Sequence, residues 1–446
     1  MQSHDPHPHS FSTMTAPLAI FWFRRDLRLE DNAGLSHALA SGSSVLPIFI
    51  FDPAILTGLP PDDARVTFIH DQLQKLRATL EKHHGSSIAL YQGKPLDIFK
   101  QLLQQFPVRA VYANHDYEPD AQARDEEVRR WLHARSVPFN TYKDHVVSEK
   151  AEITKEDGRP YMVFTPYMRK WKTMQNPATC TPYQTLSKLA NLVKDLDFPN
   201  LALSGLGFVR SSITTPAFQL NPQLLQDYAQ QRDFPALSGT SLLSPHLRFG
   251  TVSIRHIARL AFEHSDIFCN ELIWRDFFSQ ILWHFPHTRH SSFKPRYDDI
   301  QWRNNEAEFQ RWCEGTTGYP LVDAGMRQLN ATGWMHNRVR MVTASFLCKH
   351  LLIDWRWGEA YFAKKLLDYD MASNVGNWQW AAGCGVDAAP YFRIFNPTVQ
   401  VQKFDKNLHY IHTWITEWNS LTYAAPIIDH AYARERCLKA YRQAVG

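Results

Sequence analysis

Short apolar runs alternate with longer amphipathic segments through the first third of the chain. The runs are rich in β-branched and aromatic residues, as strands are, and they lie at residues 18–23, 45–51, 87–91, 110–113 and 139–147. Between them, apolar residues recur at helical spacing, which predicts helices at residues 63–83, 95–105 and 120–135. This alternation predicts an α/β domain over residues 17–150, built on a doubly wound parallel sheet.

The pattern changes after residue 150. Residues 151–226 contain seven prolines and many serines and threonines, so we interpret this segment as a long, mostly irregular interdomain linker. Residues 227–446 have few β-branched runs and are predicted to form an all-α domain, with helices at residues 254–263, 270–284, 319–330, 336–350 and 357–367. Residues 1–16 are polar and rich in histidine, which favours a disordered tail.

Composition narrows the classes of protein. Hydrophobic residues make up 44% of the 446 residues, which is enough for a large core in two or three domains. The formal net charge is only +4, so any contact with nucleic acid must come from a local basic patch. The six cysteines show no CxxC spacing, which argues against a metal site and favours a reducing, cytoplasmic setting. No apolar run approaches the roughly 20 residues that a membrane span needs.

The segment at residues 368–380 combines groups that rarely occur together. It carries the carboxylates of Asp368 and Asp370, the carboxamide of Asn374 and the indoles of Trp378 and Trp380. A solvated surface does not need two indoles, and a hydrophobic core excludes unpaired charge because its burial is costly. The mixture is typical of a pocket for a flat, polar, aromatic ligand.

Two predicted helices carry a similar mixture on one face. Glu271, Trp274 and Arg275 are spaced to share a helical face, and so are Asn337 and Met341. Such side chains can read the edge of a base and cover its ring. Taken alone, each pattern also fits an ordinary amphipathic helix.

Residues 239–245 form a turn rich in hydroxyl groups just ahead of a helical region. Its side chains and backbone N–H groups suit phosphate oxygens without the help of a lysine. The alternative is a turn that only caps the helix that follows it.

Together these segments resemble the photolyase/cryptochrome family, and within it the class I cyclobutane pyrimidine dimer DNA photolyases. The resemblance covers nearly everything after the first dozen or so residues, with motifs at residues 21–28, 240–250, 270–278, 317–341, 368–380 and 391–397. It implies that the α/β domain holds a light-harvesting antenna and that the helical domain binds FAD. The antenna is expected to be 5,10-methenyltetrahydrofolate, with a deazaflavin as the open alternative.

The resemblance also assigns flavin-binding positions. The phosphate and ribityl side of FAD falls to Tyr228, Thr240, Ser241, Leu242, Leu243 and Ser244. The remaining flavin positions are Arg275, Arg340, Asp368, Tyr369, Asp370 and Asn374. Asp368 is expected to pair with Arg340, and Asn374 to face flavin N5. Leu242 departs from the family, which commonly carries a basic residue at this position.

Residues for catalysis and DNA binding follow from the same resemblance. The expected catalytic residues are Glu271, Asn374 and an electron relay formed by Trp378, Trp355 and Trp302, although the three indoles could also be only core. The DNA lesion is expected to contact Glu271, Trp274, Asn337, Met341 and Trp380. The DNA backbone is expected to contact Arg232, Arg338, Gln400 and Lys403.

Three positions favour one branch of the family. Asn337 and Met341 stand where enzymes for the (6-4) photoproduct carry a histidine pair, and Asn374 stands where plant-type cryptochromes usually carry aspartate. The implied function is light-driven repair of cyclobutane pyrimidine dimers in UV-damaged DNA by electron transfer from excited reduced FAD. We expect a monomer without metal, in the cytoplasm and on the nucleoid if the source is bacterial. The alternative is a cryptochrome-type blue-light photoreceptor that signals through protein partners.

Overall fold

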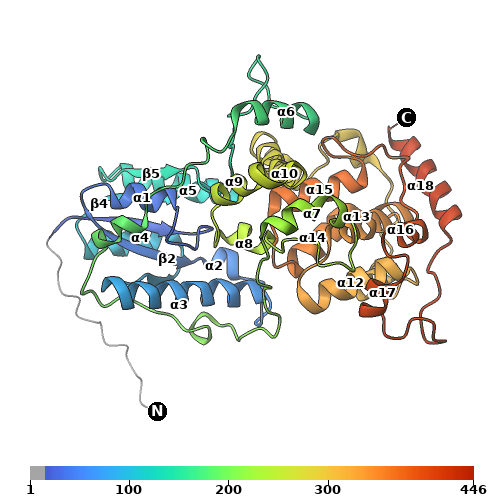
Figure 1. Cartoon of the computed structure of the whole chain (residues 1–446), viewed down its shortest axis with the longest axis horizontal. Coiled ribbons are helices and arrows are strands. Elements are labelled where there is room, and N and C mark those ends of the chain that lie inside the picture. Colours follow the sequence, from blue (N-terminus) through green and yellow to red (C-terminus); the bar gives the residue numbers. More distant parts are fainter. Residues whose placement is uncertain (1–15, 446) are drawn as a thin grey trace, which may run out of the picture.

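The computed structural model describes residues 16–445 and divides into an α/β part and a helical part (Figure 1). Within these residues, five parallel strands form one sheet in the order β3-β2-β1-β4-β5. The strands are β1 (Leu18–Phe23), β2 (Ser44–Phe51), β3 (Ala89–Gln92), β4 (Val108–Asn114) and β5 (Phe139–Tyr142). Residues 1–15 of the predicted tail lie outside the described residues.

Helices cover both faces of the sheet, as a doubly wound fold requires. Ala19, Phe21 and Phe23 of β1 pack with α1 (Ala33–Leu39) and α3 (Ala64–His84). The alternate residues Leu18, Ile20 and Trp22 pack with α4 (Pro95–Gln105) and α5 (Pro119–His133) on the other face. Alternate side chains of β1 therefore pack into two separate cores, one on each face of the sheet. This confirms the predicted parallel α/β domain. A short helix, α2 (Pro53–Leu56), follows β2.

The segment at residues 151–226 is mainly irregular, as predicted, but it also contains a helix that the sequence pattern did not reveal. This helix is α6 (Phe164–Met174), which buries Phe164, Tyr167 and Trp171 against the helical domain. Two 3-10 turns also lie in the segment, at Leu186–Asn191 and Ser204–Leu206. The predicted boundary at residue 227 falls inside α7 (Pro222–Gln231), so this helix already starts within the predicted linker.

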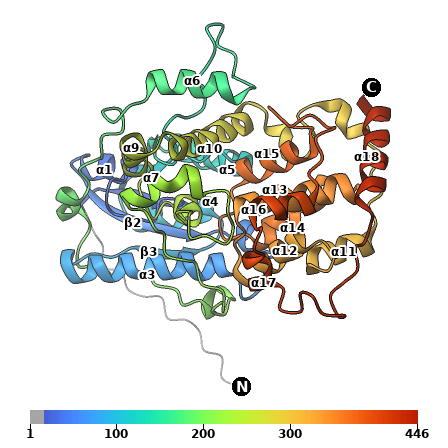
Figure 2. The same cartoon turned by 45° about the vertical axis from the view of Figure 1, so that its right-hand side comes forward.

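The rest of the described chain is helical, which confirms the predicted all-α second domain (Figure 2). The helices are α8 (Ser244–Phe249), α9 (Ile254–His264), α10 (Asp266–His284), α11 (Glu306–Glu314), α12 (Pro320–Thr332), α13 (Asn337–Ser345), α14 (Trp355–Lys365), α15 (Met371–Ala382), α16 (Pro397–Phe404), α17 (His409–Trp414) and α18 (His430–Val445). Three short turns, Pro286–Arg289, Pro295–Asp299 and the π-helical Phe346–His350, lie between them. The single helix predicted at residues 336–350 is therefore divided into α13 and a π-helical turn.

Two glycines let α15 approach its neighbours closely. A Cβ atom at Gly376 of α15 would overlap the ring of Phe278 on α10, and one at Gly358 of α14 would overlap the ring of Trp378 on α15. Asp370 caps the N-terminus of α15 by accepting a hydrogen bond from the Ser373 backbone N–H at 3.0 Å. These contacts fix the helix that carries the residues of segment 368–380.

A buried polar junction joins the two parts. The strand predicted at residues 139–147 ends at Tyr142, and Asp144 beyond it pairs with Arg28 at 2.6 Å and with Arg255 of α9 at 2.7 Å. The backbone N–H of Leu27 donates to the carbonyl of Phe249 at 3.0 Å. Gly250 (φ 63°) follows α8, and a side chain there would overlap the backbone at Arg25, so only glycine fits.

Candidate functional site

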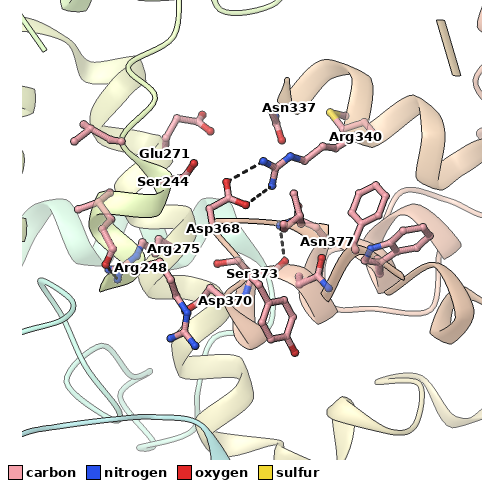
Figure 3. A pocket seen from close by; sticks show the side chains of 18 of the residues that line it. Ser244, Arg248, Glu271, Arg275, Asn337, Arg340, Asp368, Asp370, Ser373 and Asn377 are labelled. Carbon is pink, nitrogen blue, oxygen red and sulfur yellow. Dashed lines mark hydrogen bonds and ion pairs between the residues drawn. The ribbon is translucent and has the colours of Figure 1, made fainter. Parts of the chain in front are cut away.

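A cavity opens between α8 and α10 on one side and α13 and α15 on the other (Figure 3). It gathers most residues that the sequence analysis assigned to the flavin and the lesion: Tyr228, Ser241, Leu243, Ser244, Glu271, Arg275, Asn337, Arg340, Met341, Asp368, Tyr369, Asp370, Asn374, Trp378 and Trp380. These residues span more than 150 positions of the sequence, from Tyr228 to Trp380, and they meet in one cavity. The sequence analysis did not single out other lining residues, among them Arg248, Phe268, Phe362 and Asn377.

The labelled side chains lie in order through the cavity. In Figure 3, Glu271 and Asn337 lie towards the upper side, and Asp370 and Ser373 lie towards the lower side. The pair of Asp368 and Arg340 lies between them. The predicted lesion readers and the deeper flavin positions therefore share one continuous space.

The turn ahead of α8 has a backbone suited to an anion. Leu242 has φ 54°, in the left-handed region, and Leu243 after it is right-handed. Such alternation turns successive backbone N–H groups towards one point and forms an anion-binding concavity. Leu243 is the N-cap of α8 and makes no side-chain capping hydrogen bond, so the turn is not a conventional side-chain cap. A strained non-glycine residue at this point is typical of a ligand site.

Asp368 and Arg340 form the predicted pair. The guanidinium of Arg340 reaches both carboxylate oxygens, at 2.8 and 3.2 Å, and its Nε donates to the carbonyl of Met335 at 2.7 Å. The Asp368 side chain is 4% exposed and that of Arg340 is 24% exposed. This two-point contact holds the middle of the cavity rigid.

Asn374 is oriented by a residue that the sequence analysis missed. Its Nδ2 donates to the Glu359 side chain at 2.9 Å and to the Glu359 carbonyl at 3.2 Å. The Asn374 Oδ1 atom is then left to accept a hydrogen bond from a ligand. Burial raises the pKa of Glu359, although the hydrogen bond from Asn374 opposes this shift. Glu359 lies on a different helix, α14, so no local spacing could link the two residues.

Asp370 receives its main partner from the α/β domain. Arg25, just after β1, contacts the Asp370 carboxylate at 2.5 Å, and His145, after β5, lies 3.9 Å from it. Burial would raise the pKa of Asp370, but the hydrogen bond with His145 and the positive charges of Arg25 and other arginines lower it well below its usual value. Arg25 lies at the carboxyl edge of β1, where the strand order reverses between β1 and β4. Ligand sites often form at such an edge, and this was the available signal for Arg25.

Glu271 is held by an arginine at the mouth of the cavity. Arg232, which ends α7, contacts the Glu271 carboxylate at 2.5 Å, and the Glu271 side chain is 31% exposed. Burial raises the pKa of Glu271, and the neighbouring Arg232 partly opposes the increase. Burial and Arg232 therefore shift the pKa of the Glu271 carboxyl group in opposite directions.

The remaining predicted DNA contacts lie beside the cavity rather than in its lining. Arg338 pairs with Asp233 at 2.7 Å and lies 4.4 Å from the centre of the Phe404 ring, with Lys403 5.0 Å from the same ring. Gln400 is on α16, one turn before Phe404. Trp274 lies outside this lining, because its ring stacks on Phe164 of α6 with the centroids 3.7 Å apart. Thr240 and Leu242 belong to the turn before α8 but do not line the cavity.

The three predicted relay indoles lie at different depths. Trp378 lines the cavity and lies 5.0 Å from the ring of Phe362, and Trp355 is fully buried at the start of α14. Trp302 is half-buried and meets the ring of Tyr441 at 6.0 Å. Their order as an electron relay stays a prediction.

Known proteins are similar to this chain in sequence. A family model described as DNA photolyase matches residues 19–185, and a model described as the FAD binding domain of DNA photolyase matches residues 268–422. The deoxyribodipyrimidine photo-lyase of Vibrio cholerae is 37% identical, with 96% of this chain and 100% of the relative covered. That of Alkalihalophilus pseudofirmus is 35% identical, with 95% and 98% covered. The chain belongs to the DNA photolyase family.

Solved structures of photolyases share the fold. A class III photolyase from Agrobacterium tumefaciens superposes with a TM-score of 0.87 at 33% identity, covering 97% of this chain and 98% of that one. A cryptochrome from Synechocystis gives a TM-score of 0.82 at 25% identity, covering 95% and 99%. The expectation of a photolyase-family enzyme is confirmed, whereas the assignment to class I stays a prediction.

The cavity fits the FAD that this family's helical domain binds. The anion-binding turn before α8 suits the phosphates, and the buried Arg340–Asp368 pair and Asn374 offer polar atoms for a ring system. Trp378 and Phe362 supply an apolar wall. The match to the FAD binding domain of DNA photolyase confirms FAD as the expected cofactor.

No helix among residues 16–445 is long and apolar enough to cross a membrane. In this described part of the chain, no group of three or more His, Cys, Asp or Glu side chains is arranged to hold a metal ion.

Proposed function

We propose that this photolyase-family protein repairs cyclobutane pyrimidine dimers in UV-damaged DNA. The observation that carries the proposal is the shared cavity. Glu271, Asn337, Met341 and Trp380 line the same space as the flavin positions Asp368 and Asn374. A dimer that enters from the upper side of Figure 3 would therefore reach the polar readers and the flavin region together.

The side chains at the mouth suit an extruded dimer. A dimer stacks and pairs poorly, so turning it out of the duplex costs less than turning out normal bases. Asn337 and Met341 lie four residues apart on α13 and both line the cavity. Asn337 would read the polar edge, Met341 would pack against the pyrimidine face, and Trp380 would supply stacking surface.

The chemical roles divide between the cofactor and the chain. Bound reduced FAD supplies the light-excited electron that splits the cyclobutane ring and recovers it afterwards. The chain holds the dimer, excludes water and stabilises the negative charge that develops on the dimer carbonyls. Glu271 with a proton on its carboxyl group would donate a hydrogen bond to that charge. Trp378, Trp355 and Trp302 would restore the reduced state by carrying electrons from the surface.

The antenna is proposed to be 5,10-methenyltetrahydrofolate. In the α/β domain, charged and polar side chains fill the carboxyl edge of the sheet, including Arg24, Arg25, Asn114 and His145. The space left among them has room for about one water molecule. A deazaflavin buried at this edge would need the network displaced, which favours a folate held nearer the surface. The absorption spectrum of the purified protein identifies the bound antenna and would decide between the folate and the deazaflavin.

A blue-light repair assay tests the proposal. A synthetic strand with a single thymine dimer is incubated with the reduced protein, under blue light or in the dark, and the restored thymines are measured by chromatography. We expect light-dependent repair that Asn337→Ala weakens. A protein that binds FAD and changes its absorption under blue light but repairs nothing would instead be the cryptochrome-type photoreceptor.

A further inference from the structure

The two arginines proposed to contact DNA phosphates are both engaged within the protein. Arg338 pairs with Asp233, which lies outside the cavity lining, at 2.7 Å. Arg232 pairs with Glu271 at 2.5 Å and lies over the Tyr228 ring at 5.3 Å. Binding a phosphate therefore competes with an existing ion pair in each case. Only the pair of Arg232 includes a side chain that lines the cavity, that of Glu271.

We infer that Arg232 is a positioning residue that sets the protonation state of Glu271. In the free protein Arg232 holds Glu271 as a carboxylate. When a DNA phosphate draws Arg232 away and the dimer fills the cavity, Glu271 takes up one proton from solvent and becomes a hydrogen-bond donor. The inference rests on the proposed function, because it needs the dimer in this cavity.

Two changes on binding act in the same direction. The cation that favours the carboxylate departs, and the dimer covers the exposed third of the Glu271 side chain, which removes water from the charge. Burial already raises the pKa of Glu271 in the free protein while Arg232 opposes the increase. Loss of Arg232 and of water therefore raises the pKa further.

The other charged groups around Glu271 do not replace Arg232. In the described chain, Arg340 is paired with Asp368 and Arg275 contacts His145 at 2.6 Å. From α7 and the residues after it, Tyr228 has a raised pKa and Asp233 is an anion that raises the pKa of Glu271. Before α13, burial lowers the pKa of His336 to about 4, so this ring is neutral at pH 7. If Arg232 moves away, none of these neighbouring groups supplies a free cation to pair with the Glu271 carboxylate.

A group whose pKa is higher in the complex takes up a proton on binding, at pH values between its two pKa values. The affinity for dimer DNA therefore rises as the pH falls through this window, by at most about tenfold per pH unit for one proton. Undamaged DNA of the same sequence leaves Glu271 uncovered and has a smaller dependence.

Proton uptake on binding tests the inference. Calorimetry with FAD-loaded protein and a thymine-dimer duplex, in two buffers of different ionisation enthalpy, gives the protons bound per dimer at each pH. We expect uptake approaching one proton with dimer DNA and less with the undamaged duplex. Glu271→Gln should abolish the difference, because a carboxamide does not titrate.

Two matched variants isolate Arg232. Arg232→Ala should shift the low-pH edge of the uptake profile towards neutral pH, because Glu271 then has a higher pKa before binding. Arg338→Ala also loses a phosphate contact, but its partner is Asp233, so its profile should keep the wild-type edge. The FAD content and the unfolding midpoint show that each variant is folded, and Glu271→Gln tests the proton site if Arg232→Ala does not fold.

The outcomes separate the inference from the proposed function. If the wild type repairs dimers but binds them without proton uptake, or if the Arg232→Ala and Arg338→Ala profiles coincide, the role given to Arg232 is wrong. Uptake that persists in Glu271→Gln would place the proton on another group. A wild type that neither binds nor repairs dimers would overturn the proposed function itself.

Discussion

At the scale of single residues, Glu271 is the residue whose role in the repair chemistry can be separated most clearly from its role in binding the dimer. Its carboxyl group lines the cavity and is paired with Arg232 through Oε1. Glu271→Ala should lower repair per absorbed photon several-fold and lower dimer affinity less, with the FAD content unchanged. Glu271→Gln keeps a donor and should retain most of the repair. Photon-counted repair alongside binding titrations measures both effects, and an unchanged yield in Glu271→Ala would contradict the role of Glu271.

Arg340 tests the polar centre of the cavity at the same scale. Arg340→Ala leaves the Asp368 carboxylate, whose side chain is 4% exposed, without its cation. Breaking a fully buried pair costs about 3–5 kcal/mol, and the partial exposure of Arg340 reduces the expected loss in unfolding free energy to about 2 kcal/mol. The unfolding free energy measured in urea and the FAD-to-protein ratio should both fall. Equal FAD content in wild type and variant would show that the pair does not support the flavin.

At the scale of elements, the contact between α14 and α15 places Trp378 in the cavity wall. A Cβ atom at Gly358 would overlap the Trp378 ring, so Gly358→Ala should destabilise the protein by about 1–3 kcal/mol as the helices move apart. Gly205→Ala is the matched control, because a Cβ atom there meets no heavy atom within 4 Å. Thermal unfolding compares the two variants. Equal midpoints would mean that α14 and α15 accommodate the methyl group without strain.

The relay also belongs to this scale, because its indoles come from three segments. Trp378 is on α15, Trp355 begins α14, and Trp302 follows the turn Pro295–Asp299. Trp302→Phe should slow the blue-light change in flavin absorbance without abolishing repair by chemically reduced protein. Transient absorption under a reductant measures this rate. Wild-type rates in single Phe variants of all three residues would exclude the relay.

At the scale of the whole molecule, the junction around Asp144 holds the two parts together. Asp144 pairs with Arg28 and Arg255, and all three side chains are at most 10% exposed. Asp144→Ala would leave the buried Arg28 guanidinium without its carboxylate partner and Arg255 with Asp31 alone, and should lower the unfolding free energy by about 3–5 kcal/mol. Urea unfolding of the whole chain measures this, and a loss below about 1 kcal/mol, the value of an exposed pair, would contradict it.

Asp144 also predicts an acid limit for stability. Burial would raise its pKa, but Arg28 and Arg255 outweigh burial and the pKa is lowered. A carboxyl group with a lowered folded-state pKa contributes stability above its ordinary value of about 4, and this contribution is lost as the pH falls below that value. The wild type should therefore lose unfolding free energy in this acid range more steeply than Asp144→Asn.

The extent of sequence-based prediction differs between local and long-range features. β1 and α4 were predicted with their observed bounds, because apolar spacing and an N-terminal proline are local signals. The helix α6 was missed inside a proline-rich segment, since its buried face forms against α9 and α10, which are distant in sequence. Arg25 and Glu359 were missed because each acts on a cavity residue from a distant part of the chain. Most of the cavity's lining and the Arg340–Asp368 pair were predictable by family resemblance, but the pairing of Asn374 with Glu359 and of Asp370 with Arg25 was not.

The most direct measurement compares two lesions in one experiment. Reduced protein is given strands that carry either a thymine dimer or a (6-4) photoproduct, and loss of each lesion is followed by chromatography under blue light and in the dark. The cavity with Asn337 and Met341 on α13 predicts that the dimer is restored to two thymines only under light and that the (6-4) product persists. Repair of the (6-4) product without repair of the dimer, or no light-dependent repair of either, would contradict the account.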